Sequence, residues 1–123
     1  MIRILLAEDD SSMREYLQRA LQRVGYDVEA VENAEAALTA LGKRQFDLMI
    51  SDIGLPDGSG LDVMRNILVR HKIPGIALTG YGMEDDIRQS REAGFIAHLT
   101  KPLDFAKLDA MIRRVASEAG PES

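Results

Sequence analysis

The stretch ILLAEDDSSM, residues 4–13, changes from a run of apolar side chains to three consecutive carboxylates within a few positions. The apolar side chains between residues 2 and 7 are nearly continuous, which is typical of a strand buried on both faces of a parallel sheet. Glu8, Asp9 and Asp10 follow where this strand should end. Such a run is either a solvated acidic turn in front of a helix or a group of ligands for a cation.

A helix is expected immediately after the acidic run. Ser12 and Glu15 have the spacing of a capping box, in which two side chains bond to the free amides at a helix start. Gly25 follows as the expected left-handed stop of this helix. Between them, the apolar stripe with helical spacing consists of Met13, Tyr16, Leu17, Ala20, Leu21 and Val24.

The alternation of strand and helix repeats four more times along the chain. Strands that alternate with helices of about ten to fifteen residues predict an α/β fold with a five-stranded, mostly parallel sheet and helices on both faces. In such a sheet, ligands bind beyond the carboxyl ends of the strands. The further strands are expected over 26–32 (YDVEAVE), 46–51 (FDLMIS), 73–79 (IPGIALT) and 95–100 (FIAHLT), and the further helices over about 34–41, 61–70, 83–93 and 105–115.

The composition narrows the class of protein. With 123 residues, the chain suits one domain with a single core. It has no cysteine, which excludes disulfides, thiolate catalysis and cysteine-bound zinc. Its formal net charge of −5 and the lack of a basic stripe argue against nucleic-acid binding by this domain. No apolar stretch approaches the ~20 residues that span a bilayer, so we expect a cytoplasmic domain without membrane contact.

Five polar side chains fall at the ends of four of the expected strands: Glu8, Asp9, Asp52, Thr79 and Lys101. Parallel strands bring their carboxyl ends to one edge of the sheet, so three carboxylates, a hydroxyl and an ammonium are expected to share a pocket. Oxygen ligands with high negative charge suit Mg²⁺. A bound cation also lets a carboxylate stay ionised, so that it can act as a nucleophile.

Each of these residues has a plainer interpretation when it is taken alone. Asp52 also suits a cap in the loop before Pro56, Thr79 suits a strand by β-propensity, and Lys101 suits an exposed surface. His98, inside the last strand, is more often a packed histidine than a base. The presence of five suitable side chains at four strand ends nevertheless favours a site.

Four segments carry a resemblance to a known family: ILLAEDD (4–10), DLMISDIGLPDGSGLDVM (47–64), IALTGYG (76–82) and HLTKP (98–102). In this order and spacing, they make the chain similar to a receiver domain of the two-component response regulators over residues 1–119, with a flexible tail at 120–123. The resemblance implies a flavodoxin-like, three-layer fold with strand order 2-1-3-4-5.

The resemblance also implies a role for each acidic position. Asp52 matches the aspartate that accepts a phosphoryl group from a phosphohistidine. Glu8 and Asp9 match the acidic pair that holds Mg²⁺, or Mn²⁺ in its place, Asp9 directly and Glu8 through water. Asp52 and the backbone carbonyl of Gly54 complete the expected metal site. Asp10 matches none of these acids and is expected to be solvated.

Two further positions match groups that contact the attached phosphoryl group. Thr79 matches the hydroxyl residue that hydrogen-bonds it, and Lys101 matches the lysine that pairs with it. The bond between Lys101 and Pro102 is expected to be cis, as in the family. A shift of Thr79 toward the phosphoryl group would move the loop after its strand and switch the face formed by the fourth helix, fifth strand and fifth helix.

Two positions depart from the family pattern. His98 stands at the aromatic switch position, so the coupling to the switched face is expected to be weakened, altered or pH-sensitive. Gly54 stands where other members carry a side chain that shapes the attack of water, which leaves the lifetime of the phosphorylated form open.

The expected function is phosphorelay signalling, in which the domain promotes its own phosphorylation and dephosphorylation but is not an enzyme for a free substrate. The implied partners are a histidine kinase or a histidine phosphotransfer protein, and a downstream effector or a second copy on the switched face. The alternative is a degenerate receiver that serves only as an interaction or dimerisation module.

Two other classes fit the sequence less well. A flavodoxin-type FMN binder needs a phosphate cradle after the first strand, where the acidic run would repel phosphate. A haloacid-dehalogenase-like phosphatase needs an Asp-x-Asp pair, which neither EDD (8–10) nor SDIG (51–54) supplies. IALTGYG and EAGFIAHLTKPLD (92–104) resemble receivers at the C-termini of hybrid sensor histidine kinases, which favours a receiver from a larger protein over a stand-alone one.

Overall fold

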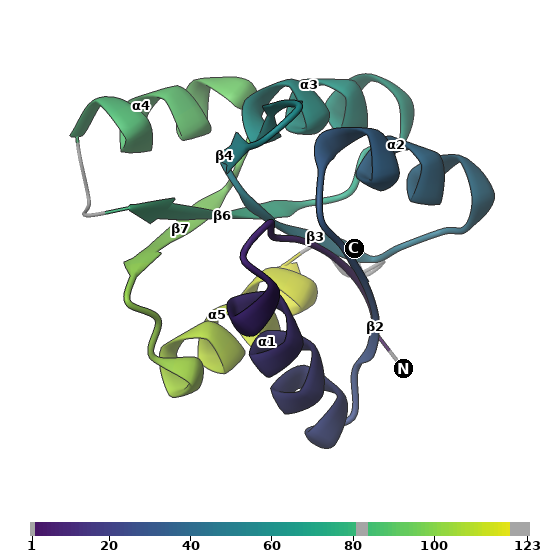
Figure 1. Cartoon of the computed structure of the whole chain (residues 1–123), viewed down its shortest axis with the longest axis vertical. Helices are drawn as coiled ribbons and strands as arrows, with labels where there is room; N and C mark the ends of the chain where they lie inside the picture. Colours follow the sequence, from purple (N-terminus) through teal and green to yellow (C-terminus); the bar gives the residue numbers. More distant parts are fainter. Residues whose placement is uncertain (1, 81–83, 119–123) are drawn as a thin grey trace.

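The computed structural model describes residues 2–80 and 84–118 of the chain, and the tail predicted at 120–123 lies outside them. A central sheet separates two layers of helices, with α2, α3 and α4 on one side and α1 and α5 on the other (Figure 1). In chain order the elements are β1 (Arg3–Ala7), α1 (Ser11–Arg23), β2 (Asp27–Val31), α2 (Ala34–Lys43), β3 (Leu48–Asp52), β4 (Gly54–Leu55), β5 (Gly58–Ser59), α3 (Gly60–Arg70), β6 (Gly75–Gly80), α4 (Glu84–Ala93), β7 (Ala97–Lys101) and α5 (Phe105–Glu118).

The main sheet has five strands in the order β2-β1-β3-β6-β7, and every neighbouring pair is parallel. These are the five predicted strands in the predicted order 2-1-3-4-5, so the predicted fold is confirmed. The order places β1 and β3 beside each other at the centre, and β6 next to β3. The carboxyl ends of β1, β3, β6 and β7 therefore meet at one edge of the sheet.

Alternate side chains of the central strands enter two separate cores. In β1, Leu5 and Ala7 pack toward α2 and α3, whereas Ile4 and Leu6 pack toward α1 and α5. All four side chains are fully buried. Both faces of the strand are covered by helices, which is why its sequence reads as a continuous apolar run instead of an alternating one.

The start of α1 differs from the predicted capping box. Asp10 is the N-cap residue, and its carboxylate accepts a hydrogen bond of 3.3 Å from the amide of Ser12. Asp10 is exposed, as expected, but it has a structural role at the positive end of the helix. Tyr16, predicted to face inward, is 52% exposed, because the buried side of the helix is centred on Leu17 and Leu21.

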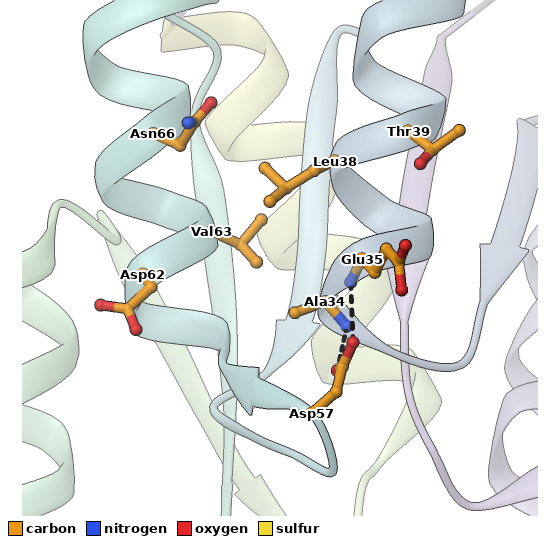
Figure 2. Close-up of a pocket in the computed structure, with 8 residues that line it drawn as sticks. All are labelled: Ala34, Glu35, Leu38, Thr39, Asp57, Asp62, Val63 and Asn66. Carbon is orange, nitrogen blue, oxygen red and sulfur yellow. Dashed lines mark hydrogen bonds between the residues drawn. The ribbon is translucent and has the colours of Figure 1, made fainter.

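The loop after β3 contains a small antiparallel hairpin, β4–β5, where the sequence predicted only turns. Asp57, in this hairpin, accepts hydrogen bonds from the amides of Ala34 (2.8 Å) and Glu35 (3.1 Å) at the start of α2 (Figure 2). These bonds, chiefly that from Ala34, lower the pKa of the Asp57 carboxyl. The hairpin that follows Asp52 is thus tied to the neighbouring helix.

One local prediction near the C-terminus agrees with the structure. The peptide bond between Lys101 and Pro102 is cis. Asp104 accepts a hydrogen bond of 2.9 Å from the amide of Ala106 in the first turn of α5, as expected of a cap. Within residues 2–80 and 84–118, the helices are too short or too polar to cross a membrane.

Candidate functional site

Three acidic side chains meet at the carboxyl edge of the sheet. Glu8 and Asp9 follow β1, Asp52 ends β3, and β1 and β3 are hydrogen-bonded neighbours with Ala7 opposite Ser51. One carboxylate oxygen from each of the three lies within 4.8 Å of the others. This acidic cluster, Glu8, Asp9 and Asp52, is the one predicted from the strand ends.

The three carboxylates differ in their exposure to solvent. Glu8 is fully buried, Asp52 is partly buried and Asp9 is exposed. Glu8 is inside because its amide still bonds to the carbonyl of Val31 on β2 (3.0 Å), which continues the pairing of the two strands by one residue. Its Oε2 accepts a hydrogen bond of 3.1 Å from the amide of Asp10.

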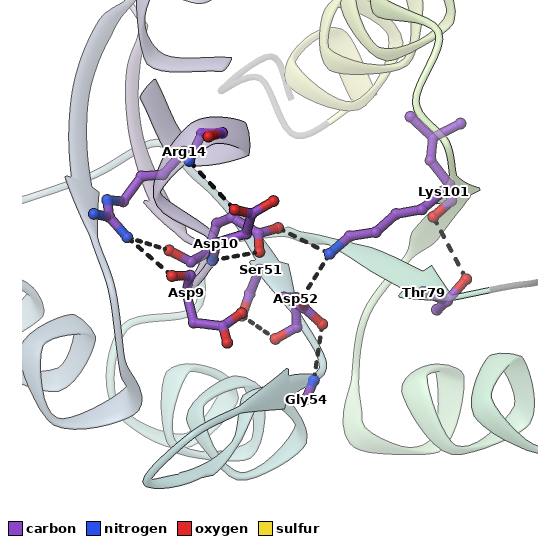
Figure 3. Close-up of polar contacts among 11 residues, drawn as sticks. Asp9, Asp10, Arg14, Ser51, Asp52, Gly54, Thr79 and Lys101 are labelled. Carbon is purple, nitrogen blue, oxygen red and sulfur yellow. Dashed lines mark hydrogen bonds and ion pairs between the residues drawn. The ribbon is translucent and has the colours of Figure 1, made fainter. Parts of the chain in front are cut away.

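Lys101 connects two members of the acidic cluster. Its Nζ lies 2.8 Å from Oδ2 of Asp52 and 3.1 Å from Oε1 of Glu8 (Figure 3). Burial lowers the pKa of the Lys101 ammonium, but the interactions with the carboxylates of Asp52 and Glu8 outweigh burial and raise this pKa above its ordinary value. The ammonium therefore stays charged and offsets part of the negative charge of the cluster.

The surroundings of the buried Glu8 carboxylate suit a bound cation. Burial raises the pKa of its carboxyl, although the Asp10 amide and Lys101 act in the opposite direction. Among the described residues, its buried Oε1 has no hydrogen bond of good geometry, and its one ion pair is with the Lys101 ammonium at 3.1 Å. A buried carboxylate oxygen that lacks a full set of partners, beside two further carboxylates, fits a hard divalent cation.

Asp52 is held from the side opposite to Lys101 by the start of the hairpin. Its Oδ1 accepts a hydrogen bond of 2.9 Å from the amide of Gly54. A Cβ atom built on Gly54 would lie 3.9 Å from this oxygen, an ordinary van der Waals distance. A side chain at position 54 would therefore fit and would stand directly beside Asp52. The predicted metal contact of the Gly54 carbonyl stays a prediction.

Gly60 also supports this loop, although no motif in the sequence predicts this role. A Cβ atom on Gly60 would collide with the backbone oxygen of Asp52 and with Oγ of Ser51. The amide of Gly60 bonds to the carbonyl of Ile53 at 3.1 Å. The start of α3 thus lies directly against the backbone of Asp52, an approach that only glycine permits.

Thr79 and His98 lie apart from the acidic cluster. The buried Oγ1 of Thr79 donates a hydrogen bond of 3.5 Å to the carbonyl of Leu99 on β7, not to Asp52. His98, opposite Ala77 in the sheet, is partly exposed and borders a small cavity with Ser90 near the C-terminal end of α4. The structure therefore places His98 next to the C-terminal half of α4.

The comparisons with known proteins agree with this geometry. A family model described as "Response regulator receiver domain" matches residues 4–113. Response regulator protein PmrA of Pseudomonas aeruginosa is 40% identical over 115 residues, which cover 91% of this chain. The chain spans only part of these curated relatives: 51% of PmrA and 27% of response regulator protein PilR of the same organism.

Two solved structures share both fold and sequence with the chain. Response regulator protein TrrA of Thermotoga maritima, in complex with Mg²⁺-BeF, is 33% identical with a TM-score of 0.84, over 94% of this chain and 99% of that chain. The signal receiver domain of a signal transduction histidine kinase from Syntrophus aciditrophicus is 30% identical with a TM-score of 0.87, over 96% and 92%. The chain belongs to the family of response regulator receiver domains of two-component systems.

Proposed function

We propose that this domain accepts a phosphoryl group on Asp52 from the phosphohistidine of a histidine kinase or a histidine phosphotransfer protein. The observation that carries the proposal is the position of the Asp52 carboxylate, which lies within 4.8 Å of carboxylate oxygens of Glu8 and Asp9 and 2.8 Å from the Lys101 ammonium. Phosphoryl transfer needs a positioned nucleophile and positive charge around the transferred group. Both are present at this edge of the sheet.

In the proposed reaction, a carboxylate oxygen of Asp52 attacks phosphorus in line with the phosphorus–nitrogen bond of the donor. A new oxygen–phosphorus bond forms, the phosphorus–nitrogen bond breaks, and its electron pair leaves with the imidazole nitrogen, which takes up a proton. Lys101 stabilises the charge on the phosphoryl oxygens from the side of β7. Hydrolysis of the acyl phosphate by water returns Asp52 to its original state.

Mg²⁺, with Mn²⁺ as a substitute, is the proposed cofactor, and it would neutralise phosphoryl oxygens next to Asp52. Glu8, Asp9 and Asp52 would hold it, with the carbonyl of Gly54 as a further ligand. Support comes from the convergent oxygens of the acidic cluster, the incompletely bonded Oε1 of Glu8 and the Mg²⁺-BeF bound by the related TrrA.

Thr79 is the proposed link between the phosphoryl group and the rest of the domain. Its hydroxyl would leave the carbonyl of Leu99, where the hydrogen bond is long at 3.5 Å, and bind a phosphoryl oxygen instead. This exchange would bias the α4–β7–α5 face between two arrangements, and an effector or a second copy would bind one of them. His98 lies on this face, where it would modify the switch.

We further infer a cytoplasmic signalling domain, here residues 1–119, that modifies itself and has no free substrate. The greater length of PilR and PmrA supports a place in a larger protein, either a response regulator or a hybrid histidine kinase. The competing function is a degenerate receiver that only binds partners. The filled positions Glu8, Asp9, Asp52, Thr79 and Lys101 favour phosphorylation.

One experiment separates the two functions. The chain is incubated with Mg²⁺ and acetyl phosphate, and its intact mass is followed over time. Wild type should gain one phosphoryl group, and EDTA should prevent the gain. Asp52→Asn should gain none, whereas Asp62→Asn, at an exposed aspartate on α3, should behave as wild type. An unmodified wild type, or equal modification of Asp52→Asn, would refute the phosphoacceptor assignment.

A further inference from the structure

Arg14, in the first turns of α1, contacts the backbone carbonyls of all three residues in the acidic run. Its backbone amide donates to the carbonyl of Asp10 at 2.8 Å, as the first hydrogen bond of the helix. Its Nη1 donates to the carbonyl of Glu8 at 3.0 Å and to that of Asp9 at 3.3 Å. In Figure 3, Arg14 approaches the loop from one side, while Asp52 and Lys101 lie on the other.

These contacts bind the backbone of the acidic loop and leave its carboxylates free. The guanidinium donates to the carbonyl oxygens of Glu8 and Asp9, and in the described part of the chain no ion pair joins it to either carboxylate. Carbonyls at this turn, outside the strand pairing, would otherwise depend on water for partners. A charged donor shared between two successive carbonyls restricts rotation of the peptide between Glu8 and Asp9.

A third contact extends from the same side chain to the neighbouring loop. Nη2 of Arg14 lies 3.8 Å from the carboxylate of Glu32, which follows β2. The side chain of Arg14 is only 22% exposed, whereas that of Glu32 is 66% exposed, so the charge pair itself is weak. The strong part of the arrangement is therefore the pair of hydrogen bonds to the acidic loop.

We propose that Arg14 is a positioning residue for the divalent cation. By fixing the peptide between Glu8 and Asp9, it holds both carboxylates in the arrangement that converges on Asp52. Without Arg14, the loop would have to be ordered when the cation binds, and the lost conformational freedom would reduce the affinity. The inference rests on the proposed function, because it assumes that the acidic cluster binds Mg²⁺.

The test is the affinity of the full chain for Mg²⁺, measured by titration calorimetry without any phosphoryl donor. Arg14→Met removes the donors but keeps the length of the side chain, and it should weaken Mg²⁺ binding about tenfold, as is typical for the loss of a group that orients a metal ligand. Arg19→Met is the matched control, since Arg19 is an exposed arginine on α1 that pairs with Glu15, away from the acidic cluster. This control should keep wild-type affinity.

A loss of stability alone must be distinguished from a loss of positioning. Tyr26→Phe serves this purpose, because it removes the 2.9 Å hydrogen bond from Tyr26, just before β2, to Asp109 on α5, and neither residue belongs to the acidic cluster. Urea unfolding ranks the variants by stability. Tyr26→Phe should be destabilised with unchanged Mg²⁺ affinity, whereas Arg14→Met should lose affinity beyond any loss expected from its stability.

The outcomes separate this inference from the proposed function. If wild type binds no Mg²⁺, the proposed metal site fails. If wild type binds Mg²⁺ and Arg14→Met binds it equally well, the metal site stands and the positioning role of Arg14 is wrong. If Arg14→Met does not fold, Arg14→Lys takes its place, with an expected loss of about threefold from the poorer fit of an ammonium to two carbonyls. Wild-type affinity in that variant would also overturn the inference.

Discussion

The Nζ atom of Lys101 lies 2.8 Å from Oδ2 of Asp52, so that an ammonium from the edge strand β7 meets a carboxylate from the central strand β3. The same ammonium lies 3.1 Å from the buried Oε1 of Glu8. One positive charge thus bridges two acids of a cluster of three. Its removal should affect stability, cation binding and phosphorylation in different directions.

Lys101→Met should destabilise the domain in the absence of Mg²⁺ by about 1–3 kcal/mol, because it leaves Glu8 and Asp52 as unpaired, partly buried carboxylates. The same change should strengthen Mg²⁺ binding, since a competing positive charge is gone. Phosphorylation by acetyl phosphate should nevertheless slow about 100-fold, because the ammonium no longer stabilises the phosphoryl oxygens. Urea unfolding, calorimetry and intact mass measure the three effects. Lys107→Met, on the exposed side of α5, is the control.

Glu8→Gln should stabilise the domain at neutral pH without Mg²⁺. Burial raises the pKa of the Glu8 carboxyl, so the folded state binds the proton more tightly than the unfolded state. The stability that this proton contributes is complete below the unfolded pKa of about 4.5 and is lost as the pH rises through the folded pKa. Above the folded pKa, wild type therefore holds an unfavourable buried charge.

The neutral amide of Gln removes this charge and keeps an oxygen that can accept from the Asp10 amide. The stability gain over wild type should shrink as the pH falls through the folded pKa of Glu8, and Mg²⁺ affinity should be lost. Urea unfolding across this pH range measures the effect. Glu15→Gln, at an exposed acid, should show neither change. A variant less stable than wild type at neutral pH would contradict the prediction.

Gly60→Ala should destabilise the domain by about 1–3 kcal/mol and slow phosphorylation of Asp52. The added methyl group collides with the backbone oxygen of Asp52 and with Ser51, so the loop at the phosphoacceptor has to shift. Thermal unfolding and intact mass report the two effects. Gly42→Ala offers a comparison, because a Cβ atom there meets nothing within 4 Å and lies far from the cluster in sequence. If Gly60→Ala and Gly42→Ala had the same stability and the same rate of phosphorylation, the close contact between Gly60 and the Asp52 backbone would be contradicted.

Thr79→Val should separate phosphorylation from the response to it. Valine keeps the shape of the side chain and removes the hydroxyl, whose 3.5 Å bond to Leu99 contributes at most about 1 kcal/mol. Modification of Asp52 should continue, whereas amide NMR shifts over α4, β7 and α5 on addition of beryllium fluoride should largely disappear. Thr100→Val, at the exposed register partner of Thr79, is the matched control. If Thr79→Val showed the same amide NMR shifts as wild type, the proposed role of Thr79 in the switch would be wrong.

Much of the fold could be predicted because it follows from local patterns. Continuous apolar runs such as residues 4–7 need cover on both faces, and helices between them supply that cover, so a parallel sheet is the consistent solution. Parallel strands then bring Glu8, Asp9, Asp52 and Lys101 to one edge, as the structure shows. Local rules did not fix the residue at which a helix begins. At the start of α1, Asp10 and Ser12 are both acceptable N-cap residues, and the path of the chain from β1 made Asp10 the cap.

The sequence by itself determined the five strands of the main sheet, the five helices, their order along the chain and the set of polar residues at the carboxyl edge. Only the tertiary structure decided how these residues differ in burial and in hydrogen-bond partners. Glu8 and Asp9 are equivalent acids in the sequence, but continued pairing with Val31 buries the first and leaves the second in solvent. The contacts of Asp57 with α2, of Gly60 with Asp52 and of Arg14 with the acidic loop leave no periodic signal. They depend on where separate segments meet in space, which no local pattern records.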